Sequence, residues 1–293
     1  MNRKLTLFVL TSILTLSAHA QSEETEQFPA TQDEQTYEPT TDNTEKPEEG
    51  DEYIKKLIKG AESGDATSQL MLGKALDFGI SIDMDKEEAV RWYTESANQG
   101  NLEAQYYLST HYYKGEGVER SIATAIKWTR SSAEGGFDKA QYTLGSCYAR
   151  GIGVTRSITD AADWWLRAAE QGNAEAQCEM GVYNLTEDNE DASPTEAVRW
   201  FRLSADQGNA RAQGYLGKCY YDGEGVKKSY TEAVKWYRLA ADQGNLQAQN
   251  NLGVCYQHGQ GVPQNEEEAV RWFRKAAARG HRLAKDNLSA LGR

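Results

Sequence analysis

The residues of this sequence that could take part in the widest range of chemistry are its four cysteines, three of which share one spacing. Cys147, Cys219 and Cys255 are separated by multiples of 36 residues, whereas Cys178 falls outside that spacing. If these positions lie on packed neighbouring helices, they are about 8–10 Å apart, and a disulfide requires Cα atoms less than about 7 Å apart. No C-x-x-C pair of the kind that binds zinc is present. We therefore expect four reduced cysteines that mostly fill buried space.

The sequence contains none of the usual signatures of hydrolytic or metal-dependent catalysis. H-E-x-x-H, G-x-S-x-G and S-x-x-K are all absent. The histidines are isolated from one another, at His19, His111, His258 and His281. An enzyme needs a nucleophile, a base or a metal cluster that converges on one site. The sequence therefore predicts a protein that is not an enzyme and that holds no cofactor or metal ion.

Two kinds of loop have a composition that recurs in ligand sites. The G-E-G-V sequence of residues 115–118 superficially resembles a phosphate-binding loop, but it has no third glycine and follows a predicted helix rather than a strand. The acidic run of residues 186–191, TEDNED, has the oxygens to hold a calcium ion but lacks the central glycine and spaced ligands of a known calcium loop. We interpret the first as a turn and the second as a solvated loop.

Most of these residues lie in a region of the chain whose pattern repeats every 36 residues. A glycine recurs at Gly64, Gly100, Gly136, Gly172, Gly208, Gly244 and Gly280. A tryptophan recurs at Trp92, Trp128, Trp164, Trp200, Trp236 and Trp272. Repetition with a period of this size indicates a solenoid, in which each unit buries its apolar face against its neighbours. We predict a half repeat over residues 51–64, six full repeats over 65–280 and a capping half repeat over 281–293.

Each repeat is predicted to contain two helices. Gln105, Leu108 and Tyr112 fall on one face of the first helix. The second helix opens at Ser121 or its equivalents, and in most copies an acidic residue follows three positions later, which is the pattern of a capping box. The repeated glycine ends this helix in a left-handed conformation. The predicted fold is all-α, a right-handed α/α superhelical solenoid of 36-residue helix-turn-helix repeats.

The first fifty residues differ in composition from the repeats. Residues 1–20 combine a basic start, an apolar run and the small-x-small motif Ala18-His19-Ala20, which is typical of a signal peptide. Residues 21–50 contain ten acidic residues, one lysine and three of the five prolines. Such a segment cannot bury enough apolar surface to offset its ordering entropy. We expect an exported protein, periplasmic or secreted, with a disordered acidic linker over residues 21–50.

The distribution of charge argues against two classes of partner. Of the net charge of −12, residues 21–50 account for −9, so the repeats are only mildly acidic. A nucleic-acid binder would show a basic stripe. No apolar run reaches the length of about 20 residues that spans a membrane. The sequence thus predicts neither nucleic-acid binding nor stable membrane insertion.

The third full repeat carries the motif A-x-x-x-L-G…Y-x-x-G-x-G-V…A-x-x-W-x-x-x-A-A-x-x-G. The motif is formed by Ala140, Leu144, Gly145, Tyr148, Gly151, Gly153, Val154, Ala161, Trp164, Ala168, Ala169 and Gly172. With this pattern, residues 51–293 resemble the Sel-one-like repeat (SLR) family, a relative of the tetratricopeptide arrays. The resemblance implies an adaptor or scaffold that binds a protein or peptide, of the kind found in the bacterial envelope, in host interaction and in eukaryotic secretory quality control.

The resemblance also brings alternatives. A cysteine-rich branch of the family has a regular disulfide pair in each repeat and has been linked to β-lactam binding. Cys178 occupies one half of such a pair, but Glu170 stands at the position of its partner. An envelope enzyme of the β-lactam-binding or β-lactamase-like type, and a secreted host-interaction (virulence) factor, are therefore the alternatives to an adaptor.

The predicted binding site follows from the analogy with tetratricopeptide arrays, whose first helices line a concave face. The lining positions vary from copy to copy while the packing positions do not, and tyrosine with arginine is typical of binding hot spots. The predicted partner-binding residues are Glu103, Tyr106, Thr110, Tyr113, Tyr142, Ser146, Arg211, Lys218, Tyr221, Gln247 and Asn250. The alternative is that these are ordinary exposed helix positions.

Overall fold

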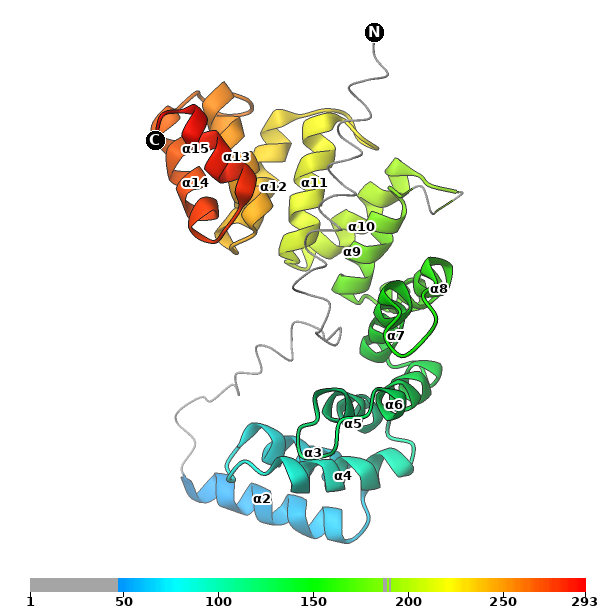
Figure 1. Ribbon diagram of the computed structural model, residues 1–293. Helices are drawn as coiled ribbons and strands as arrows, with labels where there is room; N and C mark the ends of the chain where they lie inside the picture. The colour runs from blue at the N-terminus through cyan, green and yellow to red at the C-terminus, as the bar shows by residue number, and fades with distance from the viewer. Residues whose placement is uncertain (1–46, 187–188, 190) are drawn as a thin grey trace. The chain divides into compact units, whose positions relative to one another are not determined.

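The computed structural model describes residues 47–186, 189 and 191–293, which form fourteen α-helices and no strand (Figure 1). The predicted all-α repeat fold is confirmed. The predicted signal peptide and residues 21–46 of the predicted linker lie outside the described residues. The first described helix begins at Pro47, inside the range predicted as linker.

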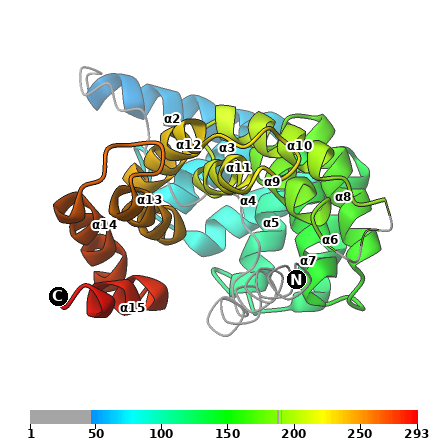
Figure 2. The ribbon, with the colours of Figure 1, turned by 90° about the horizontal axis from the view of Figure 1, so that it is seen from above.

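The helices form two compact units, one ending at Ser157 and the other beginning at Ile158. The first unit contains α2 (Pro47–Glu62), α3 (Ala66–Phe78), α4 (Lys86–Asn98), α5 (Leu102–Lys114), α6 (Ile122–Glu134) and α7 (Asp138–Arg150). The second contains α8 (Ile158–Glu170), α9 (Ala174–Tyr183), α10 (Pro194–Asp206), α11 (Ala210–Asp222), α12 (Tyr230–Asp242), α13 (Leu246–His258), α14 (Glu266–Ala278) and α15 (Arg282–Ala290). Within a unit, consecutive helices lie side by side, as α13, α14 and α15 do in Figures 1 and 2.

The second helices of the repeats (α4, α6, α8, α10, α12 and α14) begin directly after the predicted cap positions, and α12 has its cap without the full capping box. The side chains of Ser229 and Asn265 accept hydrogen bonds from the backbone N–H three residues later. The N–H of Ser229 donates to the carbonyl of Tyr220, over 2.8 Å. Because that N–H already has an acceptor, the carboxylate of Glu232 does not accept from it, as a capping box would require. The carboxylate pairs with Lys235 instead.

Small aliphatic side chains at repeated positions form the core of both units. The fully buried residues include Ala89, Ala125, Ala161, Ala197, Ala233, Ala269, Leu108, Leu144, Leu216 and Leu252. The tryptophans are less uniform than the sequence suggests, since Trp92, Trp200 and Trp272 are buried whereas the other three at this position are half-buried. The half-buried ring of Trp164 is covered by the guanidinium of Arg167, 4.5 Å from the ring centroid.

A repeated glutamine joins each repeat to the one before it. Its side-chain amide donates to the carbonyl of an alanine in the last turn of the preceding second helix, over 3.0–3.2 Å. The pairs are Gln69–Ala61, Gln105–Ala97, Gln141–Ala133, Gln177–Ala169, Gln213–Ala205 and Gln249–Ala241. Each of these carbonyls also accepts from the N–H of the glycine three residues later, so the buried glutamine adds a second hydrogen bond and connects the two repeats.

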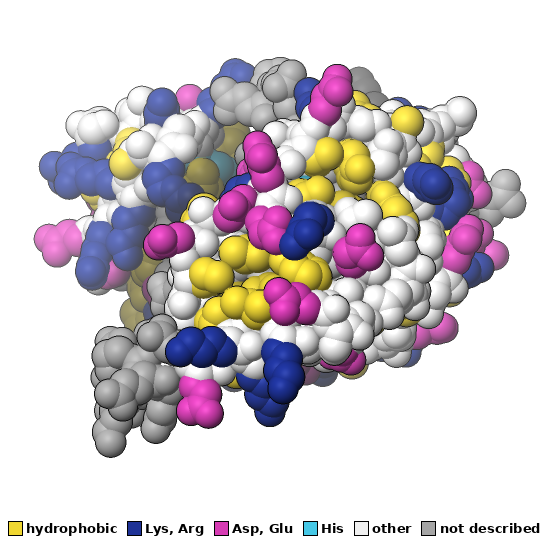
Figure 3. All heavy atoms as spheres, turned by 90° about the horizontal axis from the view of Figure 1, so that it is seen from below, with side chains coloured by type: hydrophobic (Ala, Val, Ile, Leu, Met, Phe, Trp, Pro, Cys, Tyr) yellow, Lys and Arg dark blue, Asp and Glu magenta, His cyan; other side chains and the backbone are white. Residues whose placement is uncertain are grey.

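The face of the first unit formed by α2 has no neighbouring repeat among the described residues. Tyr53, on α2, is 51% exposed. Figure 3, which views the molecule from below Figure 1, shows apolar side chains gathered between acidic and basic ones. The charged side chains therefore divide the apolar surface at this end of the array into smaller patches.

Candidate partner-binding face

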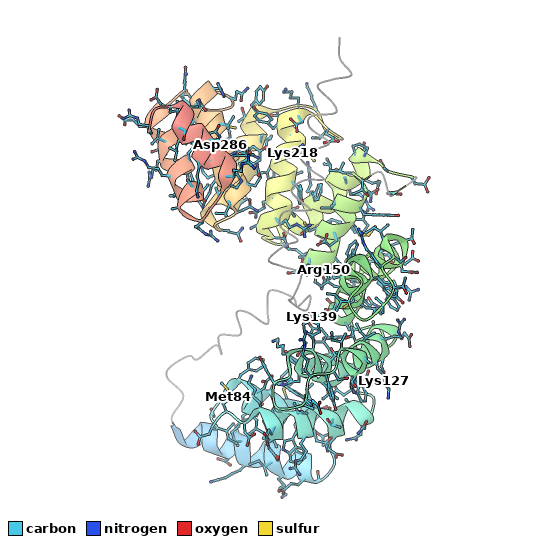
Figure 4. The ribbon with its side chains drawn as sticks, viewed as in Figure 1. Met84, Lys127, Lys139, Arg150, Lys218 and Asp286 are labelled. Atoms are coloured by element: carbon cyan, nitrogen blue, oxygen red, sulfur yellow. The ribbon has the colours of Figure 1, made fainter. Side chains whose placement is uncertain are left out.

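The first helices of the repeats (α3, α5, α7, α9, α11, α13 and α15) present the predicted binding positions. In the first unit, Figure 4 shows Lys139 and Arg150 of α7 on one side and Lys127 of α6 on the opposite side. First and second helices therefore form opposite faces of the unit. We call the side formed by the first helices the first-helix face.

Five of the six predicted residues in the first unit are buried: Tyr106, Thr110, Tyr113, Tyr142 and Ser146. The ring of Tyr106 lies 5.4 Å from the ring of Phe137, between centroids. The hydroxyl of Thr110 donates to the carbonyl of Tyr107 over 2.8 Å. These five positions are therefore not exposed, because neighbouring groups cover them, while their part in binding stays a prediction.

Glu103 is the predicted residue of the first unit that remains partly exposed. Its carboxylate pairs with the ammonium group of Lys74, on the preceding first helix. The same ammonium group lies 4.9 Å from the ring centroid of Tyr107, which is also partly exposed. This part of the face thus presents a paired charge beside an aromatic ring.

In the second unit, Arg211 is the most accessible of the predicted residues, with 47% of its side chain exposed. Both of its terminal nitrogens contact the carboxylate of Glu179, at 2.5 and 3.2 Å. Its guanidinium lies 5.7 Å from the ring centroid of Tyr215. That ring stacks on Phe201 with 5.0 Å between centroids. The arginine is therefore held in place on a rigid aromatic support.

Lys218 and Tyr221 follow on the same helix, and both are partly exposed. The ammonium group of Lys218 pairs with Asp222 over 2.8 Å. The hydroxyl of Tyr221 donates to the side-chain oxygen of Gln260 over 2.6 Å, and its ring lies 5.0 Å from that of Tyr230. Burial raises the pKa of Tyr221, so its hydroxyl stays protonated near neutral pH. The face of α11 therefore offers neutral hydroxyls and paired charges.

Gln247 and Asn250 belong to a connected group of side-chain amides on α13 and α15. Gln247 donates to Asn251 over 2.9 Å, and Asn287 donates to the oxygen of buried Asn250 over 2.9 Å. A ring nitrogen of His281 lies 3.2 Å from the oxygen of Gln247. Burial lowers the pKa of His281, which favours its neutral form. This group of amides is therefore polar and uncharged.

The sequence analysis missed one repeated position on the first helices. Tyr107 and Tyr215 occupy equivalent positions and are partly exposed. The position holds five different residue types in the six full repeats: Met71, Tyr107, Thr143, Glu179, Tyr215 and Asn251. The same variation from copy to copy that selected the other positions would have found this one.

The four cysteines are free thiols and all are buried, as the sequence predicts. Burial raises the pKa of Cys147, Cys178, Cys219 and Cys255 to about 12 in each case. Only the thiolate form is nucleophilic. These sulfur atoms therefore fill space in the core and offer no reactive group to a substrate.

We expect the native protein to show no fast-reacting thiol towards an aromatic disulfide reagent at mildly alkaline pH. After unfolding in urea, without added reductant, four thiols should react, because the pKa of each returns to its ordinary value and the sulfur becomes accessible. Absorbance of the released thiolate gives the count. A thiol that reacts at once in the native state, or fewer than four after unfolding, would contradict this assignment.

Within the described part of the chain, no three His, Cys, Asp or Glu side chains lie close enough together to hold a metal ion. The acidic loop of residues 186–191 lies partly outside that part, so the calcium interpretation stays untested. None of the described helices has both the length and the apolar character needed to cross a bilayer.

Comparison with known proteins agrees with this architecture. A model of the Sel1 repeat matches residues 66–101, 102–137, 138–173, 174–209, 210–245 and 246–281, starting one residue after the predicted boundary. The chain is similar to the solved structure of a Sel1 repeat protein from Oxalobacter formigenes, with 29% identity over 78% of this chain and 96% of that chain, and a TM-score of 0.67.

A second similar structure is a protective antigen present in uropathogenic Escherichia coli strains, which displays an SLR fold. It shares 31% identity over 80% of this chain and 58% of that chain, with a TM-score of 0.62. Comparison with curated proteins gave no match. With six consecutive Sel1 repeats over residues 66–281, the chain belongs to the Sel1 repeat family, whose members are generally protein-interaction scaffolds and typically non-catalytic.

Proposed function

We propose that this protein is an exported, non-catalytic adaptor that binds a protein or peptide partner on the first-helix face of its repeats. The observation that carries the proposal is the face of α11, where Arg211, Lys218 and Tyr221 are accessible and supported from behind. Each charge there already has a partner on the face. Arginine and tyrosine held on packed supports lose little conformational freedom on binding, which is the property of a hot spot.

Two further features support a protein or peptide as the ligand. The two cations of α11, Arg211 and Lys218, are neutralised by Glu179 and Asp222, so the face of this helix does not favour a strongly charged ligand. Side-chain amides such as Gln247 offer a donor and an acceptor together, which matches the hydrogen-bonding groups of a polypeptide main chain. Export is part of the proposal, and it rests on the signal-like composition of residues 1–20.

The experiment compares three baits that begin at Gln21 in capture from an envelope extract. The first has the native sequence, the second carries Arg211→Ala, Lys218→Ala and Tyr221→Ala on α11, and the third carries Lys235→Ala and Leu239→Ala on α12. The last two residues are exposed on the opposite face of the same repeat. All three baits must first give the same helical circular dichroism and the same melting temperature.

We expect a protein that the native and α12 baits capture and that the α11 bait loses. With that protein purified, calorimetry should show at least about a tenfold loss of affinity for the α11 variant, since a hot-spot residue contributes roughly 2 kcal/mol or more. Equal capture by all three baits, or loss with the α12 variant alone, would contradict the proposed face.

A further inference from the structure

A buried group of ionisable side chains joins the first two repeats of the first unit. Its centre is the carboxylate of Asp77, at the end of α3, whose side chain is only 5% exposed. Three donors surround it: Lys86 at 2.5 Å, the Tyr93 hydroxyl at 3.2 Å and His111 Nε2 at 3.1 Å. The lysine and the tyrosine belong to α4, and the histidine belongs to α5. The network therefore connects three consecutive helices.

The surroundings of His111 determine which protonation state fits the site. Its side chain is 3% exposed, so water does not satisfy the ring. Its Nδ1 atom lies 2.9 Å from the backbone carbonyl oxygen of Glu116, which is an acceptor only. Its Nε2 atom lies 3.1 Å from the carboxylate of Asp77. Both ring nitrogens thus face acceptors, and only the doubly protonated ring donates to both.

The other members of the network keep the carboxylate an acceptor. Burial alone would raise the pKa of Asp77, but the hydrogen bonds and charges of His111 and Lys86 outweigh it and lower that pKa below its usual value. Burial, and then the negative charge of Asp77, raise the pKa of Tyr93 well above its usual value, so its hydroxyl remains a donor. The carboxylate of Glu116 faces Lys86 at 3.8 Å and does not contact the imidazole ring.

The network is specific to the joint between the first two repeats. At the position of His111 the other full repeats carry Ala75, Cys147, Tyr183, Cys219 and Cys255. At the position of Asp77 they carry Tyr113, Ala149, Leu185, Tyr221 and Gln257. Because the remaining joints form without a pair of oppositely charged side chains at these two positions, the fold itself does not require the network. An added buried charge cluster is costly, so it calls for a role of its own.

We propose that Asp77 and His111 form a pH-sensitive latch, which holds the turn after α5 (residues 115–118) on the preceding repeat while the ring carries both protons and loosens when the ring loses one of them. A neutral ring has one N–H, so one of its nitrogens then presents a lone pair to an oxygen without water to separate them. The group that can most easily move away from the ring is the Glu116 carbonyl, because it lies in a turn at the surface.

The turn that the latch holds also contacts the start of α4. Gly117 is so close to it that a Cβ there would lie 2.2 Å from the carbonyl oxygen of Lys86. Loosening the turn therefore changes the contact between two repeats and the surface around it. The latch has a limit on the acid side as well, because the stability that ionised Asp77 contributes is lost as the pH falls through its lowered pKa in the folded state.

The test is hydrogen exchange of the full chain at about pH 5.5 and about pH 8.5. The reporters are the N–H groups of Gly115, Glu116 and Ser121, which donate to carbonyl oxygens of α5. The matched control lies in the same molecule: Gly223, Glu224 and Ser229 make the equivalent bonds after α11, where Cys219 replaces the histidine. Intrinsic exchange rates cancel in the ratio of the two turns.

We expect the protection of the first turn, relative to the second, to fall about tenfold from the lower to the higher pH, the size expected for one lost charge-assisted hydrogen bond. Asp77→Asn should abolish the fall, because an amide can accept from the charged ring or donate to the neutral one. His111→Cys, which introduces the residue of three other repeats, should abolish it too and does not depend on the asparagine variant folding.

Two results would overturn the latch. One is a wild-type ratio that stays constant between the two pH values. The other is a fall of the same size in both variants as in the wild type, since neither retains the pair. Nitrogen chemical shifts of the His111 ring give an independent check, because the proposal requires two N–H groups at the lower pH and one at the higher.

Discussion

Gly225→Ala is expected to lower the free energy of unfolding by about 3 kcal/mol or more, because alanine meets two separate obstacles there. The backbone of Gly225 has φ of 68°, in the left-handed region that a Cβ disfavours. A Cβ would also lie 2.0 Å from the carbonyl oxygen of Pro194, at the start of α10. The oxygen belongs to a helix backbone, so it cannot turn away as a flexible side chain would.

Gly208→Ala is the matched control, with an expected loss of about 1–2 kcal/mol from the left-handed conformation alone. Its φ is 94°, but nothing lies within 4 Å of the position of its Cβ. Urea unfolding followed by circular dichroism measures both variants, and peptide-level hydrogen exchange over α10 and α11 locates the loss. Equal losses for the two variants would mean that the contact with Pro194 contributes nothing.

The same contact explains why the first turn departs from the glycine pattern. Ser81 stands at the position of the second turn glycine and adopts a φ of 55°, which places a serine in the left-handed region. The residue that faces it on α2 is Gly50, where the next repeat has Lys86. A Cβ on Gly50 would lie 3.1 Å from the Ser81 hydroxyl. The turn and the preceding helix therefore still approach closely, but here the glycine is Gly50 on α2 rather than the second glycine of the turn.

Much of the fold could be predicted because its determinants are local and repeated. The period of 36 residues, the caps such as Ser229 and the closing glycines such as Gly208 each act within a few residues of chain, and six copies average out exceptions. The capping-box prediction was only half right for a non-local reason. The N–H of Ser229 is taken by the carbonyl of Tyr220 on the preceding helix, which no pattern within the second helix indicates.

The candidate site was harder to predict because exposure depends on what the neighbouring repeat presents. Tyr106 and Tyr221 were both selected as lining tyrosines, but Tyr106 is buried against Phe137, whereas Tyr221 stays partly exposed beside Tyr230. The network of Asp77 and His111 lies beyond a pattern analysis for a similar reason. The two residues are 34 positions apart, and each is an exception at its own place in the repeat.

One non-local rule can be recognised in the sequence once the structure is known. A glycine in the middle of most first helices faces an aromatic ring on the second helix of the same repeat. A Cβ on Gly253 would lie 2.6 Å from the ring of Phe273, and Gly73 and Gly217 face Tyr93 and Tyr237 in the same way. In the second full repeat both members change together, to Ser109 and Thr129. A larger residue on one helix is matched by a smaller one on the other.

This compensation predicts the outcome of exchanging one pair for the other. Gly253→Ser alone should cost about 3 kcal/mol, because its Cβ enters a rigid and fully buried ring. Phe273→Thr alone should cost about 4 kcal/mol through the cavity that it leaves. Together they should cost about 4 rather than 7 kcal/mol, since the serine fills part of that cavity and the clash disappears. Urea unfolding of the four proteins completes the double-mutant cycle.

The natural pair, Ser109 and Thr129, shows that the two hydroxyl groups do not prevent this recovery of stability. Ser109 donates to the carbonyl of Tyr106 over 2.6 Å and Thr129 to that of Ala125 over 2.9 Å, so each is satisfied within its own helix. Gly214→Ser on α11 controls for adding serine to a first helix, because the nearest atom to its Cβ position is 3.7 Å away. Its effect should stay within about 0.5 kcal/mol. If the costs of the two exchanges simply add, the matching of side-chain sizes at these two positions is coincidence. If the double variant recovers about 3 kcal/mol, the sizes of these two side chains are coupled, and together they determine how the two helices of a repeat pack.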